Sequence, residues 1–140
     1  MAFELPIEHF SKHVPWGGAS GDADIIEMGV NLTGAAFAMN FATANGGTPI
    51  AGIALTTATA GSQGVSVTYD ADYVHPETGE VIGASTIRPQ IDEASLEALT
   101  WGADPSAPLV LRYDLLVTPS GAPQEVYCYG TFTLHPGIGD

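Results

Sequence analysis

Alternation of bulky and small residues recurs along much of the chain and predicts short β-strands. Between residues 36 and 42 the bulky Phe37, Met39 and Phe41 alternate with alanine and asparagine. A strand here places three large side chains on one face, which we expect to face the core. Residues 49–57 follow an Asn-Gly-Gly sequence that tolerates positive φ, so the two segments are expected to form a hairpin.

The last third of the chain carries the clearest alternation. Every second residue from Leu109 to Val117 is large and apolar, and a turn rich in proline and glycine follows. A second alternating segment, interrupted at Gly130, then predicts a long antiparallel hairpin. The residues of this second segment that are expected to share one face are Val126, Cys128, Phe132 and Leu134.

Shorter segments supply the remaining predicted elements. Three regions are expected as strands: 24–30, 65–69, and a hairpin formed by 73–74 and 81–87. Only residues 91–99 predict a helix, about two turns long by their spacing, with Asp92 as a possible N-cap. No repeat is present that would indicate a solenoid or a propeller.

Residues 1–21 show no sustained alternation, although they contain several large apolar residues. We therefore expect an extended N-terminal arm over 1–21 and a β-sandwich domain over 22–140. Apolar side chains without a place in a sandwich are candidates for contact with a partner. The candidate partner-contact residues are Phe3, Leu5, Ile7, Phe10 and Trp16, whereas Trp101 is expected to seal one end of the sandwich.

The predicted elements favour an all-β fold, an immunoglobulin-like antiparallel β-sandwich of seven to nine strands with one short helix and the N-terminal arm. A length of 140 residues fits one domain. The 17 glycines and 10 prolines have no period, so they act as turn residues between short elements.

Charge narrows the classes of partner. The chain has 3 basic and 16 acidic residues, a formal net charge of −13. Nucleic acids are held by several lysine or arginine side chains that displace counterions, so nucleic-acid binding is nearly excluded. Anionic membrane surfaces are disfavoured for the same reason. The sequence shows neither a signal peptide nor an apolar run long enough to span a bilayer, so we expect a protein made in soluble form in the cytoplasm.

The sequence offers no catalytic motif. The phosphate-binding P-loop, the dinucleotide-binding glycine pattern and the nucleophile elbow are all absent. Glycoside cleavage needs two facing carboxylates, and a chain with sixteen acidic residues contains chance pairs. We therefore expect no enzymatic activity and no catalytic residues; the carboxylates considered for a glycosidase are Glu77, Glu80, Asp92, Glu93 and Glu97.

Metal and cofactor sites are likewise not expected. His9 and His13 have helical spacing, but a zinc site needs three or four ligands. The triplets Asp22–Asp24 and Asp70–Asp72 are the best candidates for calcium, yet each offers only two carboxylates and calcium takes about six or more oxygens. The single cysteine, Cys128, alternates with core-facing residues and is expected to be a buried thiol.

Two segments resemble small virion proteins of tailed bacteriophages. Asn31-Leu32-Thr33-Gly34 with Phe37-Ala38-Met39-Asn40-Phe41 is similar to a turn and strand of those proteins, and residues 111–121 and 125–137 are similar to their closing hairpin. The family's arginines near the methionine are replaced by Ala38, Asn40 and Ala42, and residues 70–89 are longer than usual. These proteins resemble the immunoglobulin-like N-terminal domain of baseplate upper and fibre-attachment proteins.

The resemblance implies a virion structural protein, an adaptor that attaches fibres or neighbouring subunits to the tail, baseplate or capsid. Its expected partners are other virion proteins and copies of itself, with no nucleic acid, no membrane and no cofactor. A carbohydrate-binding module is the first alternative, because the chain has two tryptophans and five tyrosines. A glycoside-active enzyme is the second. Exposed coplanar aromatics would favour the first alternative, and facing carboxylates the second.

Overall fold

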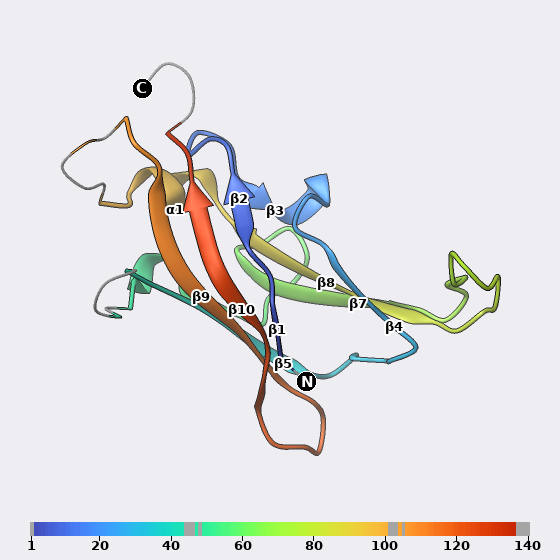
Figure 1. The fold of residues 1–140 in the computed structure, drawn as a ribbon. Coiled ribbons are helices and arrows are strands. Elements are labelled where there is room, and N and C mark those ends of the chain that lie inside the picture. Colours follow the sequence, from blue (N-terminus) through green and yellow to red (C-terminus); the bar gives the residue numbers. More distant parts are fainter. Residues whose placement is uncertain (1, 44–46, 48, 101–103, 105, 137–140) are drawn as a thin grey trace.

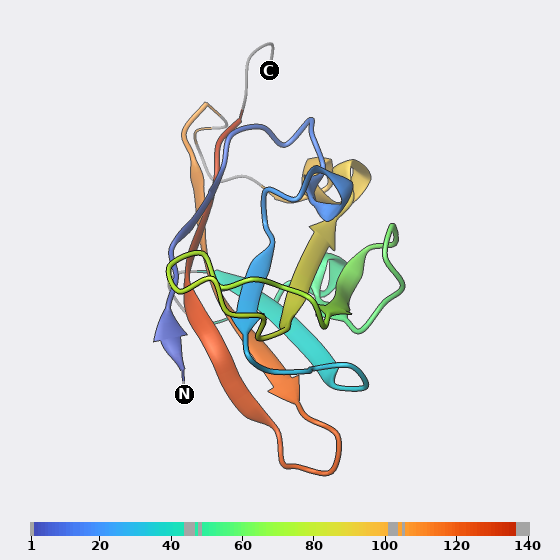
Figure 2. The same ribbon diagram turned by 90° about the vertical axis from the view of Figure 1, so that its right-hand side faces the viewer.

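The chain folds into two packed β-sheets with one short helix (Figures 1 and 2). The computed structural model describes residues 2–43, 47, 49–100, 104 and 106–136. The strands are β1 (Phe3–Glu4), β2 (Ile7–His9), β3 (Trp16–Gly17), β4 (Ile25–Met28), β5 (Ala36–Thr43), β6 (Leu55–Thr56), β7 (Gly64–Asp70), β8 (Ala84–Ile91), β9 (Leu109–Thr118) and β10 (Glu125–Leu134). The helix is α1 (Glu93–Glu97), and short 3-10 turns are η1 (Gly18–Ser20) and η2 (Ala51–Ile53). The predicted all-β sandwich with one short helix is confirmed.

The first sheet has the order β1-β10-β9-β5-β6, and β2 also pairs with β10. β9 and β10 form the predicted long hairpin. β5 runs antiparallel to β9, with Met39 opposite Leu115 and Phe41 opposite Tyr113. Because directly opposite residues share a face, the alternating large residues of both strands point into the sandwich together.

The second sheet is built around β8. β7 pairs with one edge of β8 along its length, while β3 and β4 pair in succession with the other edge. Ile87 of β8 lies opposite Val67 of β7 and Ile25 of β4. This row supplies the second sheet's inner face, which confirms the predicted alternation in residues 65–69 only as far as Val67, because Tyr69 is exposed.

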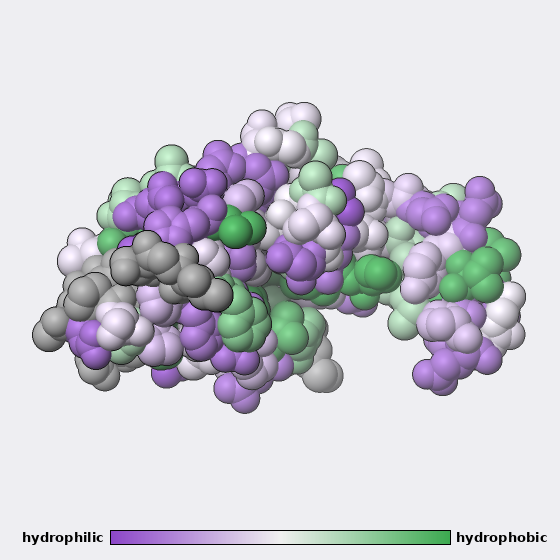
Figure 3. Space-filling view, turned by 90° about the horizontal axis from the view of Figure 1, so that it is seen from above, coloured by the Kyte–Doolittle hydropathy of each residue, from purple (hydrophilic) through white to green (hydrophobic). Residues whose placement is uncertain are grey.

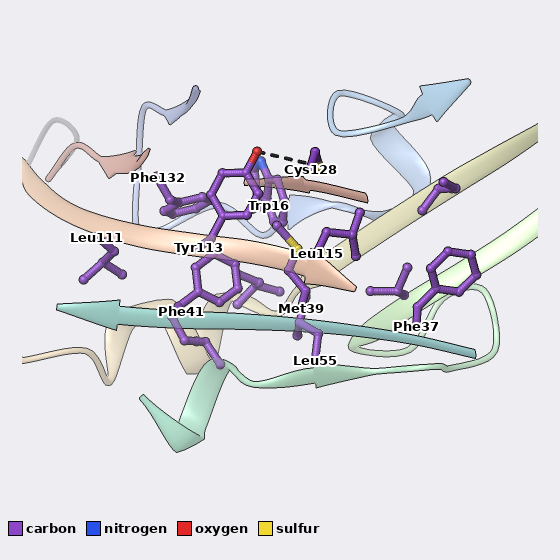
Figure 4. Close-up of a cluster of buried hydrophobic side chains, with 14 of the residues drawn as sticks. Trp16, Phe37, Met39, Phe41, Leu55, Leu111, Tyr113, Leu115, Cys128 and Phe132 are labelled. Atoms are coloured by element: carbon purple, nitrogen blue, oxygen red, sulfur yellow. Dashed lines mark hydrogen bonds between the residues drawn. The ribbon is translucent and has the colours of Figure 1, made fainter. Parts of the chain in front are cut away.

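An aromatic cluster joins the sheets (Figure 4). Phe132 of β10 meets the rings of Trp16 and Phe41 edge to face, at centroid distances of 5.1 and 5.2 Å. Such pairs contribute about 0.5–1.5 kcal/mol each beyond the burial of area. The residues predicted to share this core are all buried, namely Phe37, Met39, Phe41, Leu111, Tyr113 and Leu115.

The N-terminal segment is part of the sandwich. β1 and β2 pair in parallel with β10, so the first sheet is not purely antiparallel. β3 pairs with β8, and the Trp16 ring is only 3% exposed. The prediction that the apolar residues of 1–21 have no place in the sandwich is therefore wrong for Leu5, Ile7 and Trp16. Strands of two or three residues are too short to show an alternating pattern.

A β-bulge changes the parity of β10. Val126 lies opposite Leu116, whereas Cys128 lies opposite Leu115, so Tyr127 is an extra residue. Cys128, Phe132 and Leu134 are buried as predicted, but Val126 is exposed. The prediction for Val126 is wrong because a bulge inserts one residue and reverses the faces beyond it.

The helix is shorter than predicted, and β8 begins later in the sequence than predicted. α1 covers Glu93–Glu97, and Asp92 precedes it without a side-chain capping bond. The Asp92 carboxylate instead accepts a hydrogen bond from Nε2 of Gln90 at 2.8 Å. β8 begins at Ala84, since Val81 forms only an isolated bridge with Val74. Trp101, expected to seal the sandwich, lies outside the described residues.

Trp16 and Phe10 make a matched test of how the N-terminal segment is used. Trp16→Ala should lower the free energy of unfolding by about 3–5 kcal/mol, because it leaves a cavity beside Phe132. Phe10→Ala should change it by less than about 1 kcal/mol, since the ring is 68% exposed. Urea denaturation of both variants measures the difference. Equal, small losses would mean that the segment does not complete the core.

Candidate interaction surface

The predicted contact residues separate into a buried and an exposed group. Trp16 is a core residue, so it offers no surface to a partner and its assignment as a contact is corrected. Leu5 and Ile7 are partly buried and pack against the core. Phe3 and Phe10 are exposed and stay candidates for contact.

Backbone contacts fix the exposed residues in place. The Leu5 amide donates to the carbonyl of Tyr129 at 2.8 Å, and the Leu5 carbonyl accepts a bond from the Tyr113 hydroxyl. Gly130 permits this approach, because a Cβ there would lie 2.9 Å from the Leu5 carbonyl oxygen. Farther along, the amide of His135 donates to the carbonyl of His9 at 2.8 Å.

Ring contacts orient the two exposed phenylalanines. Phe10 stacks on His135 with a centroid distance of 4.8 Å and an interplanar angle of 12°. His135 Nε2 donates to the Glu8 carboxylate at 3.3 Å. At the other end, Phe3 meets Tyr127 edge to face at 5.3 Å. Phe3 lies beside the buried Cys128 on the inner side of this edge, whereas Glu4 lies beside Tyr129 on its outer side. We name both sides of this edge together the N-terminal edge surface; its residues are Phe3, Glu4, Glu8, Phe10, Tyr129 and His135.

The chemistry of this edge disfavours pairing with another strand. Pro6 separates β1 from β2 and carries no amide proton, and Glu4 and Glu8 place negative charges on the outermost strands. Proline and charge are the features by which natural edge strands avoid adding further strands. Recognition at the N-terminal edge surface would therefore use side chains rather than an extended backbone ladder.

Tyr127 connects this edge with the second sheet. Its hydroxyl donates a hydrogen bond to the Glu27 carboxylate of β4. Burial, followed by this hydrogen bond and the negative charge of Glu27, raises the pKa of Tyr127 well above its ordinary value. Tyr127 thus contacts Phe3 through its ring and Glu27 of the second sheet through its hydroxyl.

The carboxylates considered for glycoside cleavage lie in two separate places. Glu77 and Glu80 belong to the connection between β7 and β8, whereas Asp92, Glu93 and Glu97 belong to α1 and its first end. Figure 1 shows these two regions on opposite sides of the molecule. The structure therefore does not bring the two groups together across one cleft.

The candidate metal ligands are engaged in other contacts. Asp24 accepts two hydrogen bonds from Arg88, at 2.8 and 2.7 Å, which also raise the pKa of Arg88. Asp22 accepts from the Gly17 amide and from Ser20. Asp70 accepts from the amide of Asp72, two residues later. In the part of the chain that the structure describes, no three His, Cys, Asp or Glu side chains gather as a metal site.

The histidines at helical spacing also point to different partners. His9 Nε2 donates to the Val14 carbonyl at 2.7 Å, and the side chain is buried rather than solvated. His13 Nδ1 donates to the Glu97 carboxylate of α1 at 2.8 Å. The spacing does not produce a shared site because β2 ends at His9 and no helix follows it.

A cleft of about 450 Å³ lies between the N-terminal segment and the sheets. Most of its lining is apolar, including Leu5, Ile7, Trp16 and Met39. Its carboxylates come from Glu8, Asp22 and Asp24, each of which already accepts a hydrogen bond within the chain. The lining therefore offers shape for a small apolar group but little polar recognition.

Comparisons with protein-family models and with curated proteins find no match. No helix among the residues placed by the structure has the length and apolarity needed to cross a bilayer.

Cys128 provides a test of how closed the core is. The side chain is fully buried, and burial raises the pKa of its thiol to about 11 despite a weak bond from Tyr113. Because the thiolate is the reactive form, a disulfide reagent at pH 8 should label native protein far more slowly than protein unfolded in urea. Rapid stoichiometric labelling of the native chain would show that the cleft beneath β1 and β2 opens freely.

Calcium should not change the stability of the fold. The carboxylates of the first Asp-Ala-Asp triplet are held by Arg88, Gly17 and Ser20, and the second triplet forms a local turn. Thermal melts in chelator and in calcium, at matched ionic strength, should superimpose. A rise in midpoint with calcium that disappears in Asp70→Asn would identify the second triplet as a binding site.

Proposed function

We propose that the chain is a bacteriophage virion structural protein, a β-sandwich adaptor that attaches fibres or neighbouring subunits to the tail, baseplate or capsid. The observation that carries the proposal is the N-terminal edge surface, where two exposed phenylalanines are oriented by ring contacts with residues of the sandwich. The kind of particle is inferred from the sequence resemblance to virion proteins of tailed bacteriophages. The protein would be made in soluble form in the host cytoplasm and function in the virion.

The geometry of this surface favours binding to a protein. Phe3 and Phe10 are fixed by contacts with Tyr127 and His135, so little conformational freedom is lost when a partner covers them. Aromatic side chains are enriched at the centres of protein interfaces, where a few residues supply most of the binding energy. Glu4 and Glu8 form a polar rim beside them.

The charge of the chain supports the same role. A net charge of −13 keeps separate copies apart and soluble before assembly. It also directs the protein toward neighbours with basic surfaces. The proposed partners are other virion proteins, together with further copies of the chain where a neighbouring protein holds them.

A carbohydrate-binding module is the second candidate. A shallow depression on the outer face of the first sheet is lined by Asn40, Arg112, Asp114 and Tyr129. An exposed ring beside hydrogen-bonding side chains is a combination that suits a sugar. Trp16 does not contribute, because it is buried. Titration with oligosaccharides, monitored through the resonances of Tyr129, distinguishes this candidate from the first.

Incorporation into particles tests the adaptor role directly. The chain should be found at defined positions in intact particles by electron cryomicroscopy. Phe10→Asp should fold with an unchanged melting temperature but be incorporated at least about tenfold less, because it places a charge at an apolar contact. Val110→Asp, at an exposed valine on the outer face of β9, is the matched control.

Two results would contradict the proposal. Purified particles that lack the chain would reject the virion role. Normal incorporation of both Phe10→Asp and Phe3→Asp would show that the N-terminal edge surface is not the contact, even if the chain is present.

A further inference from the structure

A hairpin extension projects from the second sheet between β7 and β8. We name residues 71–83 the hairpin tip. Figure 1 shows it at the right of the molecule, beyond the labelled strands, and Figure 2 shows it from its end. Most of its side chains are exposed, so it contributes little to the core.

Backbone hydrogen bonds give the hairpin tip a defined conformation. The amide of His75 donates to the carbonyl of Glu80 at 2.8 Å, and the amide of Ile82 donates to the carbonyl of Tyr73 at 2.9 Å. The ring nitrogen Nδ1 of His75 accepts bonds from the amides of Glu77 and Thr78. Both the backbone and the His75 side chain therefore stabilise the turn.

The base of the hairpin tip is braced against the sandwich. Tyr69 covers Gly83, where an added Cβ would lie 2.2 Å from the phenol oxygen and φ is +69°. The Gly83 carbonyl accepts a bond from the Gly29 amide, just beyond β4, at 2.8 Å. The hydroxyl of Ser85 donates a hydrogen bond to the carbonyl of Val30, in the turn that follows β4. The base of the projection is therefore joined by hydrogen bonds to the residues that follow β4.

The exposed chemistry of the hairpin tip is an apolar pair within an acidic rim. Val74 and Val81 are 50% and 64% exposed and lie directly opposite each other, so they share one face. Asp72, Glu77 and Glu80 are exposed and lie within four residues of one of the valines in the sequence, and the segment contains no lysine or arginine. Glu80 pairs with His75, so its side chain leaves the hairpin on the face opposite to the two valines. Figure 3 shows the projecting end, at the right, with apolar surface between hydrophilic patches.

We infer that the hairpin tip inserts into a different protein, whose surface has an apolar recess bordered by lysine or arginine side chains. Charge identifies the occupant: the whole chain has three basic residues, and Arg88 is bound to Asp24. A second copy would bring a further net charge of −13 and only Lys12 and Arg112 as other basic residues, so charge favours a different protein. An anionic membrane would be repelled. The inference deepens the adaptor role proposed above and rests on it, because the partner is taken to be a neighbour in the same particle.

Two single substitutions with matched controls test the contact during assembly in the native host. Val81→Asp is compared with Val110→Asp, and Glu80→Lys is compared with Glu125→Lys, which lies on the exposed start of β10. The two hairpin variants should be incorporated at least about tenfold less than their controls, since one charges the apolar centre and the other reverses the rim. Melting temperatures close to that of the parent chain establish that each variant is folded.

Photo-cross-linking identifies what the hairpin tip touches. With p-benzoylphenylalanine at position 81, intact particles should yield a cross-link to a different protein, at a peptide that contains lysine or arginine. The same photoreactive group at position 110 should not give this product.

The yield of assembly should fall as the salt concentration rises from physiological strength to about 1 M, where the screening length of charge interactions shortens to about 3 Å.

The outcomes separate the two proposals. A chain absent from the particle rejects the adaptor role and the hairpin contact together. A chain present in the particle, with position 81 cross-linked only to another copy or to nothing, rejects the hairpin contact and leaves the adaptor role intact. Normal incorporation of both Val81→Asp and Glu80→Lys rejects the hairpin contact as well.

Discussion

The packing of Trp16 and Phe41 on Phe132 is the interaction on which the rest of the structure depends. Trp16 comes from the N-terminal segment, Phe41 from β5 and Phe132 from β10, so three distant parts of the sequence meet at one point. Because Trp16 also pairs through its backbone with β8, this contact ties the two sheets together. The exposed residues of β1 and β2 lie on a sheet whose inner face is filled by this cluster.

The acidic residues have different roles at different places in the structure. Asp24 and Glu27 are satisfied locally, by Arg88 and Tyr127. Glu4, Glu8 and Glu80 instead border surfaces with exposed apolar residues. The negative charge around these apolar residues thus opposes contact between two copies of the chain. It favours contact with a different protein that has a basic surface.

The central strands and the hairpin between β7 and β8 could be predicted from the sequence, whereas the N-terminal strands and the bulge in β10 could not, for physical reasons. β5, β9 and most of β10 are half-buried over eight or more residues, so their period of two is visible in Phe37, Met39 and Phe41. β1 to β3 are too brief for any period, and the bulge at Tyr127 leaves no local signature. Of the candidate contact residues, Phe3 and Phe10 are exposed, whereas Trp16 is buried in the core. Its burial could not be predicted locally, because it depends on pairing with β8, which is distant in the sequence.

The parallel pairing of β1 and β2 with β10 constrains the order of events during synthesis. These N-terminal strands have no partner until the residues of β10 have left the ribosome, since the described residues place no other strand beside them. Contacts between such distant positions form slowly, because a long loop must close first. The nascent chain therefore carries the apolar side chains of Leu5 and Ile7 without their native neighbours until the residues of β10 have been made. An excess of negative charge protects such an intermediate from aggregation, which gives the acidic composition a role before the protein has folded at all.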